Sequence, residues 1–423
     1  MQILAAIRTP FTSMGASLAS QAAADLGRDA ATVLLAQTGI DPEELSEVII
    51  GCVCQPVDSA NIARVIALRS GVPKNVPAVT VNRNCASGME AITTAAERIA
   101  AGRGDLYLVG GVDSMSNVPL LYRPTAVQKF VHLAKARRVG QKLRALLGFR
   151  PADFSPLIGL QLGLTDPYSG LNMGETAEVL ARDYRITREQ QDAYAVKSQK
   201  KAAASRDFFD EEIATVYLGG KSISADDGIR EGSSIEKLAK LRPVFNRKTG
   251  SVTAGNASQI TDGAVMLLVA TEQKADDLAT RYGLEPLGRL TGYAYTGCDP
   301  RSMGIGPVQA IARANQLTGL SLDDADTIEI NEAFAAQVLA CCKALSDPSY
   351  CQLAGLDTPL GEIPMGKLNP HGGAIALGHP VGATGARLVL TALHELANTG
   401  KKRALTSLCI GGGQGAALWL ETS

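Results

Sequence analysis

Several features that mark particular classes of protein are scarce in this chain of 423 residues. Aromatic residues make up 4% of the sequence, and no apolar run approaches the length of a membrane span. The 41 basic and 42 acidic residues nearly cancel, which excludes nucleic-acid binding by overall charge. The four histidines lack the paired spacing of metal ligands, so we expect no metal site.

Small and apolar residues dominate the composition of the chain. The chain has 43 glycines and is 46% hydrophobic, which is typical of α/β enzymes whose helices pack closely on a sheet. Eight cysteines without an export signal indicate reduced thiols and a cytoplasmic location. The opening MQILAAIRTPF predicts a first strand and turn rather than a targeting peptide, and the final ETS is not a peroxisomal signal.

Most of the cysteines are expected to serve packing. Cys52 and Cys54 would point to the same face of a strand, as core or cleft-wall residues, and no second pair follows to complete a metal site. Cys341, Cys342 and Cys351 lie in or near a predicted helix. These five residues therefore carry no predicted chemistry.

Two segments of the chain follow the same plan, and the length itself indicates more than one lobe. Each has an acidic turn, a strand, a helix that begins at a small-residue turn, and a strand that ends in glycines; they span 38–116 and 318–420. We therefore predict an α/β protein with two similar lobes and an insertion in the first, including a helix over 187–208. The predicted units are an N-terminal lobe (1–117), an inserted loop domain (118–257), a returning strand and helix (258–282) and a C-terminal lobe (283–423).

The insertion contains a stretch with charges of one sign only. Between Asp113 and Asp153 there is no acidic residue but eight basic ones, and apolar residues are interleaved at helical spacing within 121–150. This pattern predicts one or two basic amphipathic helices, which can lie on an anionic membrane surface. The alternative is a solvated face that covers a neighbour or attracts a phosphorylated ligand.

Cys85 is the most informative residue. A short apolar run, 78–81, precedes it, and apolar residues with helical spacing follow it, so it is expected where a strand ends and a helix begins. The N–H groups and dipole of a helix N-terminus stabilise a thiolate and lower the pKa of a cysteine. The alternative is a small buried hydrophobic residue.

Four segments place polar groups among small residues, as in a tight active site. They are NRNCASG around Cys85, NEAFA at Asn331, GGAIALGHPVGATGAR at His379 and CIGGGQG at Cys409. Together with IRTPF, LNMGETAE and TAGNASQITDGA, they resemble the motifs of the thiolase family over the whole chain. The resemblance implies the thiolase-like fold, with two similar α/β lobes in five layers, αβαβα.

The resemblance also implies roles for the residues in these motifs. Cys85 would be the acylated nucleophile, His379 the base that takes its proton, and Cys409 the acid/base for the acetyl-CoA enolate. Asn331 would hold a water that stabilises the enolate oxygen, and the N–H groups of Cys85 and Gly411 would form an oxyanion hole. The alternatives are that Asn331 caps a helix, that His379 is a helix-start histidine, and that Cys409 is a buried strand cysteine.

Coenzyme A would bind as a substrate, mainly on the insertion, and no permanently bound cofactor is implied. Ser258 would hydrogen-bond the pantetheine arm, Met173 and Phe334 would line the pocket, and Arg230 would lie near the nucleotide. The family further implies a homodimer or a dimer of dimers.

Within the family, the middle of the chain most resembles the β subunit of the fatty-acid oxidation trifunctional complex. In that branch the basic segment contacts membranes or partner subunits. For this chain the resemblance would imply a hydratase/dehydrogenase α subunit as the partner. Asn331 and the CIGGG segment instead resemble short-chain, acetoacetyl-type thiolases. The expected activity is thiolysis of 3-ketoacyl-CoA in β-oxidation; the alternatives are acetoacetyl-CoA synthesis and a non-catalytic, thiolase-like lipid carrier. A ketoacyl-synthase-type condensing enzyme would lack a second catalytic cysteine such as Cys409.

Overall fold

A computed structural model describes residues 1–422. Its main feature is a ten-stranded sheet in the order β12-β13-β14-β11-β1-β10-β5-β3-β4, with β2 attached to β10. The strands of the first half are β1 (Gln2–Arg8), β2 (Thr12–Ser13), β3 (Glu47–Gly51), β4 (Ala78–Val81), β5 (Leu106–Ser114) and β10 (Thr261–Ala270). Those of the second half are β11 (Gly288–Gly297), β12 (Thr327–Ile330), β13 (Arg403–Ile410) and β14 (Gln414–Glu421).

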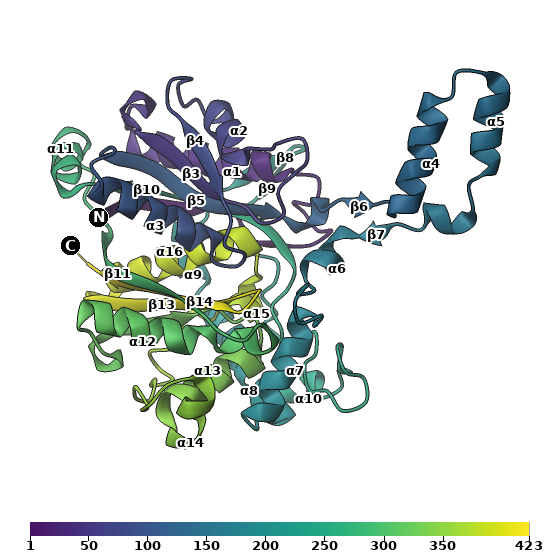
Figure 1. Cartoon of the computed structure of the whole chain (residues 1–423). Coiled ribbons are helices and arrows are strands. Elements are labelled where there is room, and N and C mark those ends of the chain that lie inside the picture. The colour runs from purple at the N-terminus through teal and green to yellow at the C-terminus, as the bar shows by residue number, and fades with distance from the viewer. Residues whose placement is uncertain (423) are drawn as a thin grey trace.

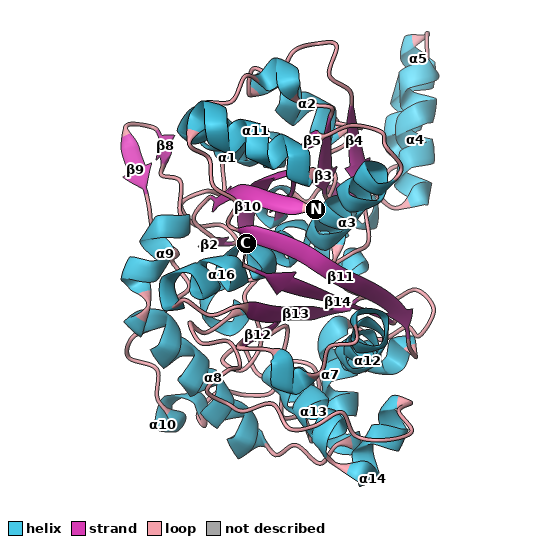
Figure 2. Ribbon diagram, turned by 90° about the vertical axis from the view of Figure 1, so that its left-hand side faces the viewer, coloured by secondary structure: helices cyan, strands magenta, loops and turns pink. Residues whose placement is uncertain are grey.

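Helices cover both halves of the sheet and fill the space between them (Figures 1 and 2). The outer helices of the first half are α1 (Ala23–Thr38), α2 (Ile62–Arg69) and α11 (Glu272–Tyr282), and those of the second half are α12 (Gly306–Thr318), α13 (Ala335–Ser346) and α14 (Pro348–Cys351). The central layer consists of α3 (Ser87–Ala100) and α16 (Val381–Thr399). The predicted five layers are therefore confirmed.

The inner strands β5, β10, β13 and β14 are buried on both faces, and their apolar residues alternate between two cores. In β10, Met266 and Leu268 pack with the outer helices, whereas Val265 and Leu267 pack with the central helices. Such alternation follows from the two-residue period of a strand. Burying each of these side chains contributes about 1.5–3 kcal/mol.

The two halves share the repeat predicted from the sequence. β3 pairs in parallel with β5, and β12 pairs in parallel with β13, each through a crossover that contains a central helix. β10 and β14 then add in antiparallel orientation. Matching positions in the two halves therefore lie at the starts of α3 and α16.

The insertion surrounds one end of these layers. Its elements are β6 (Leu120–Leu121), α4 (Pro124–Lys135), α5 (Val139–Leu147), β7 (Leu157–Ile158), α6 (Gly159–Gly163), α7 (Met173–Asp183), α8 (Arg188–Ala204), α9 (Arg206–Glu212), β8 (Val216–Leu218), β9 (Lys221–Ile223) and α10 (Ile235–Leu238). The helix expected over 187–208 begins as predicted, with Thr187 as its N-cap, but it breaks at Ser205, where the backbone leaves the helical region (φ −112°, ψ 25°). A short helix, α15 (Ala374–Leu377), precedes α16.

The basic segment forms the predicted pair of amphipathic helices. β6 and β7 form a two-stranded ribbon that carries α4 and α5 away from the body as a helical hairpin (Figure 1). Aromatic packing of Phe130 against Phe149 and Tyr122 closes its base, with ring centroids 4.9 and 5.0 Å apart. Among residues 1–422 no helix is long and apolar enough to cross a membrane.

Candidate active site

Cys85 lies in the turn between β4 and α3, as predicted. The preceding Asn84 adopts a left-handed conformation (φ 45°), which asparagine tolerates better than most residues. Its N–H donates to Asn82 Oδ1 (2.9 Å) and its carbonyl accepts from Ser87 Oγ (2.7 Å), while Ser87 Oγ also accepts from Arg83 N–H (2.9 Å). This bonded turn fixes the direction in which the Cys85 side chain leaves the backbone.

The thiol of Cys85 is protonated in the free protein. Burial raises the pKa of Cys85, and the carboxylate of Asp113 adds to this, while the backbone N–H groups of Gly411 and of Cys85 itself act in the opposite direction. The expected lowering of this pKa by the helix start is therefore wrong for the free chain, because desolvation outweighs it. The sulfur nevertheless lies at the two N–H groups expected to form an oxyanion hole, and it needs a base.

His379 lies in the short connection between α15 and α16. Its Nδ1 is 2.6 Å from Thr384 Oγ1, whose single hydrogen is donated to the carbonyl of Pro380 (2.9 Å). The ring N–H must therefore be on Nδ1, which leaves the lone pair of Nε2 free to accept a proton. Burial, followed by the charge of Arg387, lowers the pKa of His379 to about 4, so the ring is neutral.

Close contact between α3 and α16 brings the two loops together. A Cβ at Gly88 would lie 2.7 Å from the backbone nitrogen of Ala386, and one at Gly385 would lie 2.8 Å from that of Met89. Only glycine permits this approach. These contacts join the first turn of α3 to the second turn of α16, and a Cβ at Gly88 would also lie 3.0 Å from the carbonyl of Gly382 in the first turn of α16. The connections that carry Cys85 and His379 therefore meet at one place.

Cys409 completes the group from the end of β13. The glycine turn 411–413 follows it, and Asn84 Nδ2 donates to the carbonyl of Gly411 (2.7 Å), which ties this turn to the Cys85 loop. Cys409 is fully buried, and burial raises its pKa well above the usual value, with the nearby Cys85 adding to the effect. Its thiol therefore remains protonated and can act as an acid.

Asn331 follows β12 and is also fully buried. Its N–H donates to the carbonyl of Ser407, but neither side-chain polar atom has a partner within residues 1–422. The helix-cap alternative is wrong, since α13 begins only at Ala335 with Phe334 at its N-cap. A buried amide without partners is costly, so this side chain is suited to a water or a substrate oxygen.

Glu332, the next residue, is a positioning residue that the sequence analysis missed. Its carboxylate accepts hydrogen bonds from Tyr194 (2.9 Å) and Ser198 (2.6 Å) of α8, from Asn369 (3.0 Å), and from the N–H of Ile375 (3.2 Å). It thereby joins the insertion, the end of β12 and the loop before His379. The signal was its position between Asn331 and an apolar run, where a charge is expected to be paired.

The residues expected to bind coenzyme A divide into two groups. Met173, at the start of α7, packs in one apolar cluster with Phe334 and Cys409. Ser258 lies beside them, because its N–H donates to the carbonyl of Ala333 (2.9 Å). Arg230 is not brought to this cluster; its N–H binds Gln199 Oε1 (2.7 Å), in a loop tied to α8.

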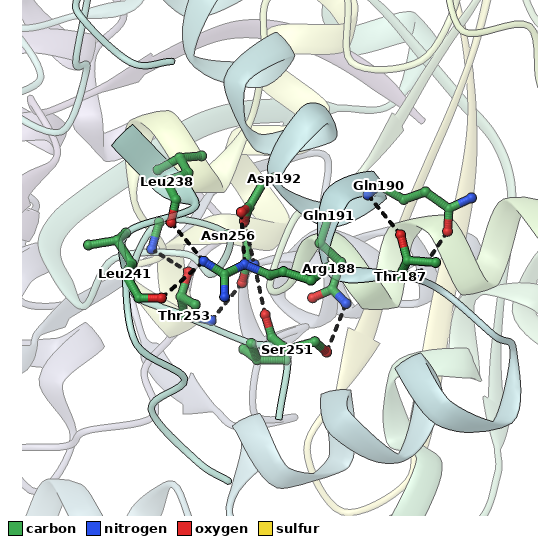
Figure 3. Close-up of polar contacts among 12 residues, drawn as sticks. Thr187, Arg188, Gln190, Gln191, Asp192, Leu238, Leu241, Ser251, Thr253 and Asn256 are labelled. Atoms are coloured by element: carbon green, nitrogen blue, oxygen red, sulfur yellow. Dashed lines mark hydrogen bonds and ion pairs between the residues drawn. The ribbon is translucent and has the colours of Figure 1, made fainter. Parts of the chain in front are cut away.

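A polar network in the insertion holds the segment that contains Ser258 (Figure 3). Arg188 pairs with Asp192 (2.8 Å) one turn later on α8 and donates to the carbonyl of Leu238 (2.7 Å). Asp192 accepts from Asn256 Nδ2 (2.9 Å), and Asn256 Oδ1 accepts from the N–H of Thr253 (2.8 Å). The loop 251–259 is therefore fixed against α8 at the edge of the site.

One sequence-based expectation about cysteines is wrong in its premise. Cys52 and Cys54 do not lie on a strand, because β3 ends at Gly51. They lie in a turn whose N–H groups surround the carboxylate of Asp113. Cys52 is nevertheless a core residue and Cys54 is half-buried, but the turn around Asp113, and not the face of a strand, sets their positions.

Two thiols, a neutral imidazole, an unpartnered amide and converging backbone N–H groups on a duplicated α/β fold are the kinds of group that acyl transfer requires. Comparison with known families agrees: residues 1–273 match the thiolase N-terminal domain and 284–422 the thiolase C-terminal domain. The chain belongs to the thiolase family and is an acyltransferase.

Three relatives show how far the similarity extends. An acetyl-CoA acetyltransferase of Chromobacterium violaceum is 42% identical, over 99% of this chain and 98% of the relative. The crystal structure of a Bacillus anthracis acetyl-CoA acetyltransferase is 37% identical with a TM-score of 0.85, covering 100% of this chain and 98% of the other. A human mitochondrial 3-ketoacyl-CoA thiolase, solved in complex with CoA, is 36% identical with a TM-score of 0.84 and the same coverage.

Proposed function

We propose that the protein is a degradative 3-ketoacyl-CoA thiolase, which cleaves a 3-ketoacyl-CoA with CoA to give an acyl-CoA and acetyl-CoA. The observation that carries this proposal is the arrangement of two thiols, the half-buried Cys85 and the buried Cys409, with His379, whose Nε2 is free to accept a proton. Thiolysis needs a nucleophile, a base and a separate acid, and the reaction is reversible. The residues of the pocket and of the oxyanion holes serve the same proposed reaction.

In the first half-reaction Cys85 attacks the 3-keto carbon while its proton passes to Nε2 of His379. The bond between C2 and C3 then breaks, which leaves the acyl group on the Cys85 sulfur and an enolate of acetyl-CoA. Cys409 protonates C2 of this enolate and becomes a thiolate. Asn331 would hold the water at the enolate oxygen, and the N–H groups of Cys85 and Gly411 would bind the other oxyanion.

In the second half-reaction the thiol of CoA loses its proton to the Cys409 thiolate. The CoA sulfur attacks the acyl carbon, the thioester to Cys85 breaks, and Cys85 recovers its proton from His379. All three side chains return to their starting protonation states. Met173, Phe334 and Ser258 would hold the pantetheine arm; Arg230, which is separate from this cluster, could reach only the nucleotide end.

A biosynthetic acetoacetyl-CoA thiolase is the second candidate, favoured by Asn331 and the CIGGG segment. Steady-state thiolysis of 3-ketoacyl-CoAs of graded length by wild type and Cys85→Ala separates the possibilities. Activity on long substrates supports degradation, and activity confined to the four-carbon substrate supports the second candidate. Full activity of Cys85→Ala would overturn both, and failure of acetyl-CoA to label Cys85 in a mass spectrum would favour a lipid carrier.

We also propose a homodimer, or a dimer of two such dimers, that pairs through β4. This strand ends the sheet, has β3 on one side only, and all four of its residues are half-buried. At the opposite end of the sheet, β12 is covered by a bridge from Ile328 to Leu368. An uncovered edge strand is normally blocked or paired, so a second copy is the simplest cover.

Finally, we propose a cytoplasmic enzyme whose hairpin, 121–150, makes peripheral contact with an anionic membrane, or else with a hydratase/dehydrogenase subunit. Val139 and Leu147 of α5 are 84% and 78% exposed, beside basic residues that have few acidic partners. Lys129 is the exception, as it pairs with Asp153 (2.6 Å). Apolar exposure combined with positive charge is the composition of a membrane-surface helix.

A further inference from the structure

Asp113, at the end of β5, is a fully buried carboxylate that the mechanism above does not use. Its Oδ1 accepts from the N–H groups of Val53 (3.1 Å) and Cys54 (2.7 Å) and lies 3.4 Å from the Cys52 thiol. Its Oδ2 accepts from the N–H of Gly382 (2.5 Å). One carboxylate therefore joins the turn after β3 to the first turn of α16, three residues beyond His379.

The neighbours of Asp113 make this arrangement specific to a carboxylate. Both of its oxygens face backbone N–H groups, which cannot rotate to become acceptors. A Cβ at Gly382 would lie 2.9 Å from Asp113 Oδ2 and 3.0 Å from the carbonyl of Val112, so glycine is what lets the start of α16 lie this close to β5. An amide of the same shape has only one acceptor oxygen and would place its NH2 group against one of these donors.

Asp113 also acts on Cys85 through its charge. The groups that contact it are Cys52, Val53 and Cys54 from the turn after β3 and the N–H of Gly382 from α16, and its partner on β10, Gly263, has no side chain. Its charge also reaches Cys85, in the turn before α3, where it opposes ionisation of the thiol. No basic side chain binds Asp113 within the described chain. A buried negative charge near a thiol disfavours the thiolate.

We propose that Asp113 is a positioning residue of the acyl-transfer site: it fixes the start of α16, and hence His379, against the turn after β3, and its charge adds to the burial that keeps Cys85 protonated until substrate binds. The proposal rests on the role of Cys85 as the acylated nucleophile. This role of Asp113 explains how a protonated Cys85 and a neutral His379 coexist in the free enzyme. Proton transfer then coincides with attack on the substrate.

The test uses the full-length enzyme with Asp113→Asn and, as a matched control, Asp262→Asn. Asp262 is an equally buried carboxylate on β10, but it binds the hydroxyls of Ser114 and Ser116, which can rotate to accept from an amide, together with one N–H. Alkylation of Cys85 by iodoacetamide is followed by peptide mass spectrometry from pH 5 to 9. It requires no turnover, so its result does not depend on whether the enzyme is a thiolase.

In Asp113→Asn we expect alkylation of Cys85 to shift to lower pH by on the order of one unit, because a neighbouring charge is lost. We expect kcat/KM for acetoacetyl-CoA thiolysis to fall about 100-fold, because the base is displaced. Asp262→Asn should leave the alkylation profile in place. An unchanged profile in Asp113→Asn, or a loss of kcat/KM no larger than in Asp262→Asn, overturns the proposal.

Wild-type enzyme provides a second measurement that does not depend on folding of a variant. Burial raises the pKa of Asp113 to about 6. As the pH rises through 6, the growing negative charge on Asp113 opposes ionisation of Cys85. The alkylation rate of Cys85 should therefore rise by less than tenfold per pH unit near pH 6, and by tenfold per pH unit again at higher pH. A constant tenfold rise per unit from pH 5 to 8 contradicts the role of Asp113.

Discussion

Replacing Thr384 with valine tests how the protonation of His379 is set. Valine has the shape of threonine but lacks the oxygen that accepts from Nδ1–H at 2.6 Å. The ring is buried, so an unsatisfied N–H there costs about 1–3 kcal/mol. Moving the hydrogen to Nε2 would relieve that cost but would remove the lone pair proposed to accept the Cys85 proton. Converted at 1.36 kcal/mol per factor of ten, kcat should fall roughly 5- to 150-fold.

The assay is the rate at which acetyl-CoA acetylates Cys85, measured by rapid quench and mass spectrometry beside steady-state thiolysis. Thr391→Val is the matched control, because Thr391 lies on the same helix, is equally buried, and its hydroxyl has no partner within residues 1–422. We expect a slow acetylation step in Thr384→Val and a near-normal one in Thr391→Val. Equal rates in the two variants would refute the assigned tautomer and the role of Thr384.

Four further outcomes are expected. Burial lowers the pKa of His379 from 6.5 to about 4, so between these pH values the histidine is protonated in the unfolded chain but not in the folded one. The free energy of unfolding in urea should therefore drop as the pH falls from 6.5 to 4, and it should drop less in His379→Asn. Arg387 and Glu329 form a fully buried ion pair (2.8 Å), so Arg387→Met should lower the free energy of unfolding in urea by about 3–5 kcal/mol, because it leaves the Glu329 charge without its partner. The double variant Arg387→Met, Glu329→Leu should recover much of that loss; no recovery would mean that Arg387 stabilises the fold through other partners. Deleting the hairpin 121–150 should abolish pelleting with anionic vesicles and leave short-substrate thiolysis intact; equal pelleting counts against membrane contact. Phe334→Ala should raise KM for 3-ketoacyl-CoA more than it lowers the acetylation rate of Cys85, and a selective loss of that rate would contradict a pocket-wall role.

Much of the fold followed from patterns of period two and 3.6 in the sequence. The repeat in the two halves was visible because β3 and β12 are both followed by a small-residue turn and a helix. The basic pair of helices was visible because a charge of one sign alternates with apolar residues over two helical lengths. The break at Ser205 was not visible, since nothing in the local sequence stops a helix there.

The site was predictable only where a residue type itself carries chemistry. Cys85, His379 and Cys409 stand out as reactive groups, and Asn331 as an isolated amide. Asp113 and Glu332 act through partners distant in sequence, such as Gly382 or Ile375, so no spacing indicated them. Thr384 is close to His379 in the chain, but a threonine in a helix does not by itself indicate a partner for a histidine. The protonation of Cys85 depended on burial by the whole fold, which a helix start alone does not reveal.

The glycine contact between α3 and α16 brings together residues from both halves of the duplicated fold, so under the proposed mechanism neither half holds a working site by itself. In the proposed mechanism the thiol to be acylated comes from the first half, and its base and the proton donor come from the second, with the helix starts of the two halves in close backbone contact. If the chain were cut in the connection near residue 284, each fragment would carry an incomplete set of reacting groups. Acyl transfer would then report directly on reassembly of the two fragments, since no turnover is possible until the helices meet again.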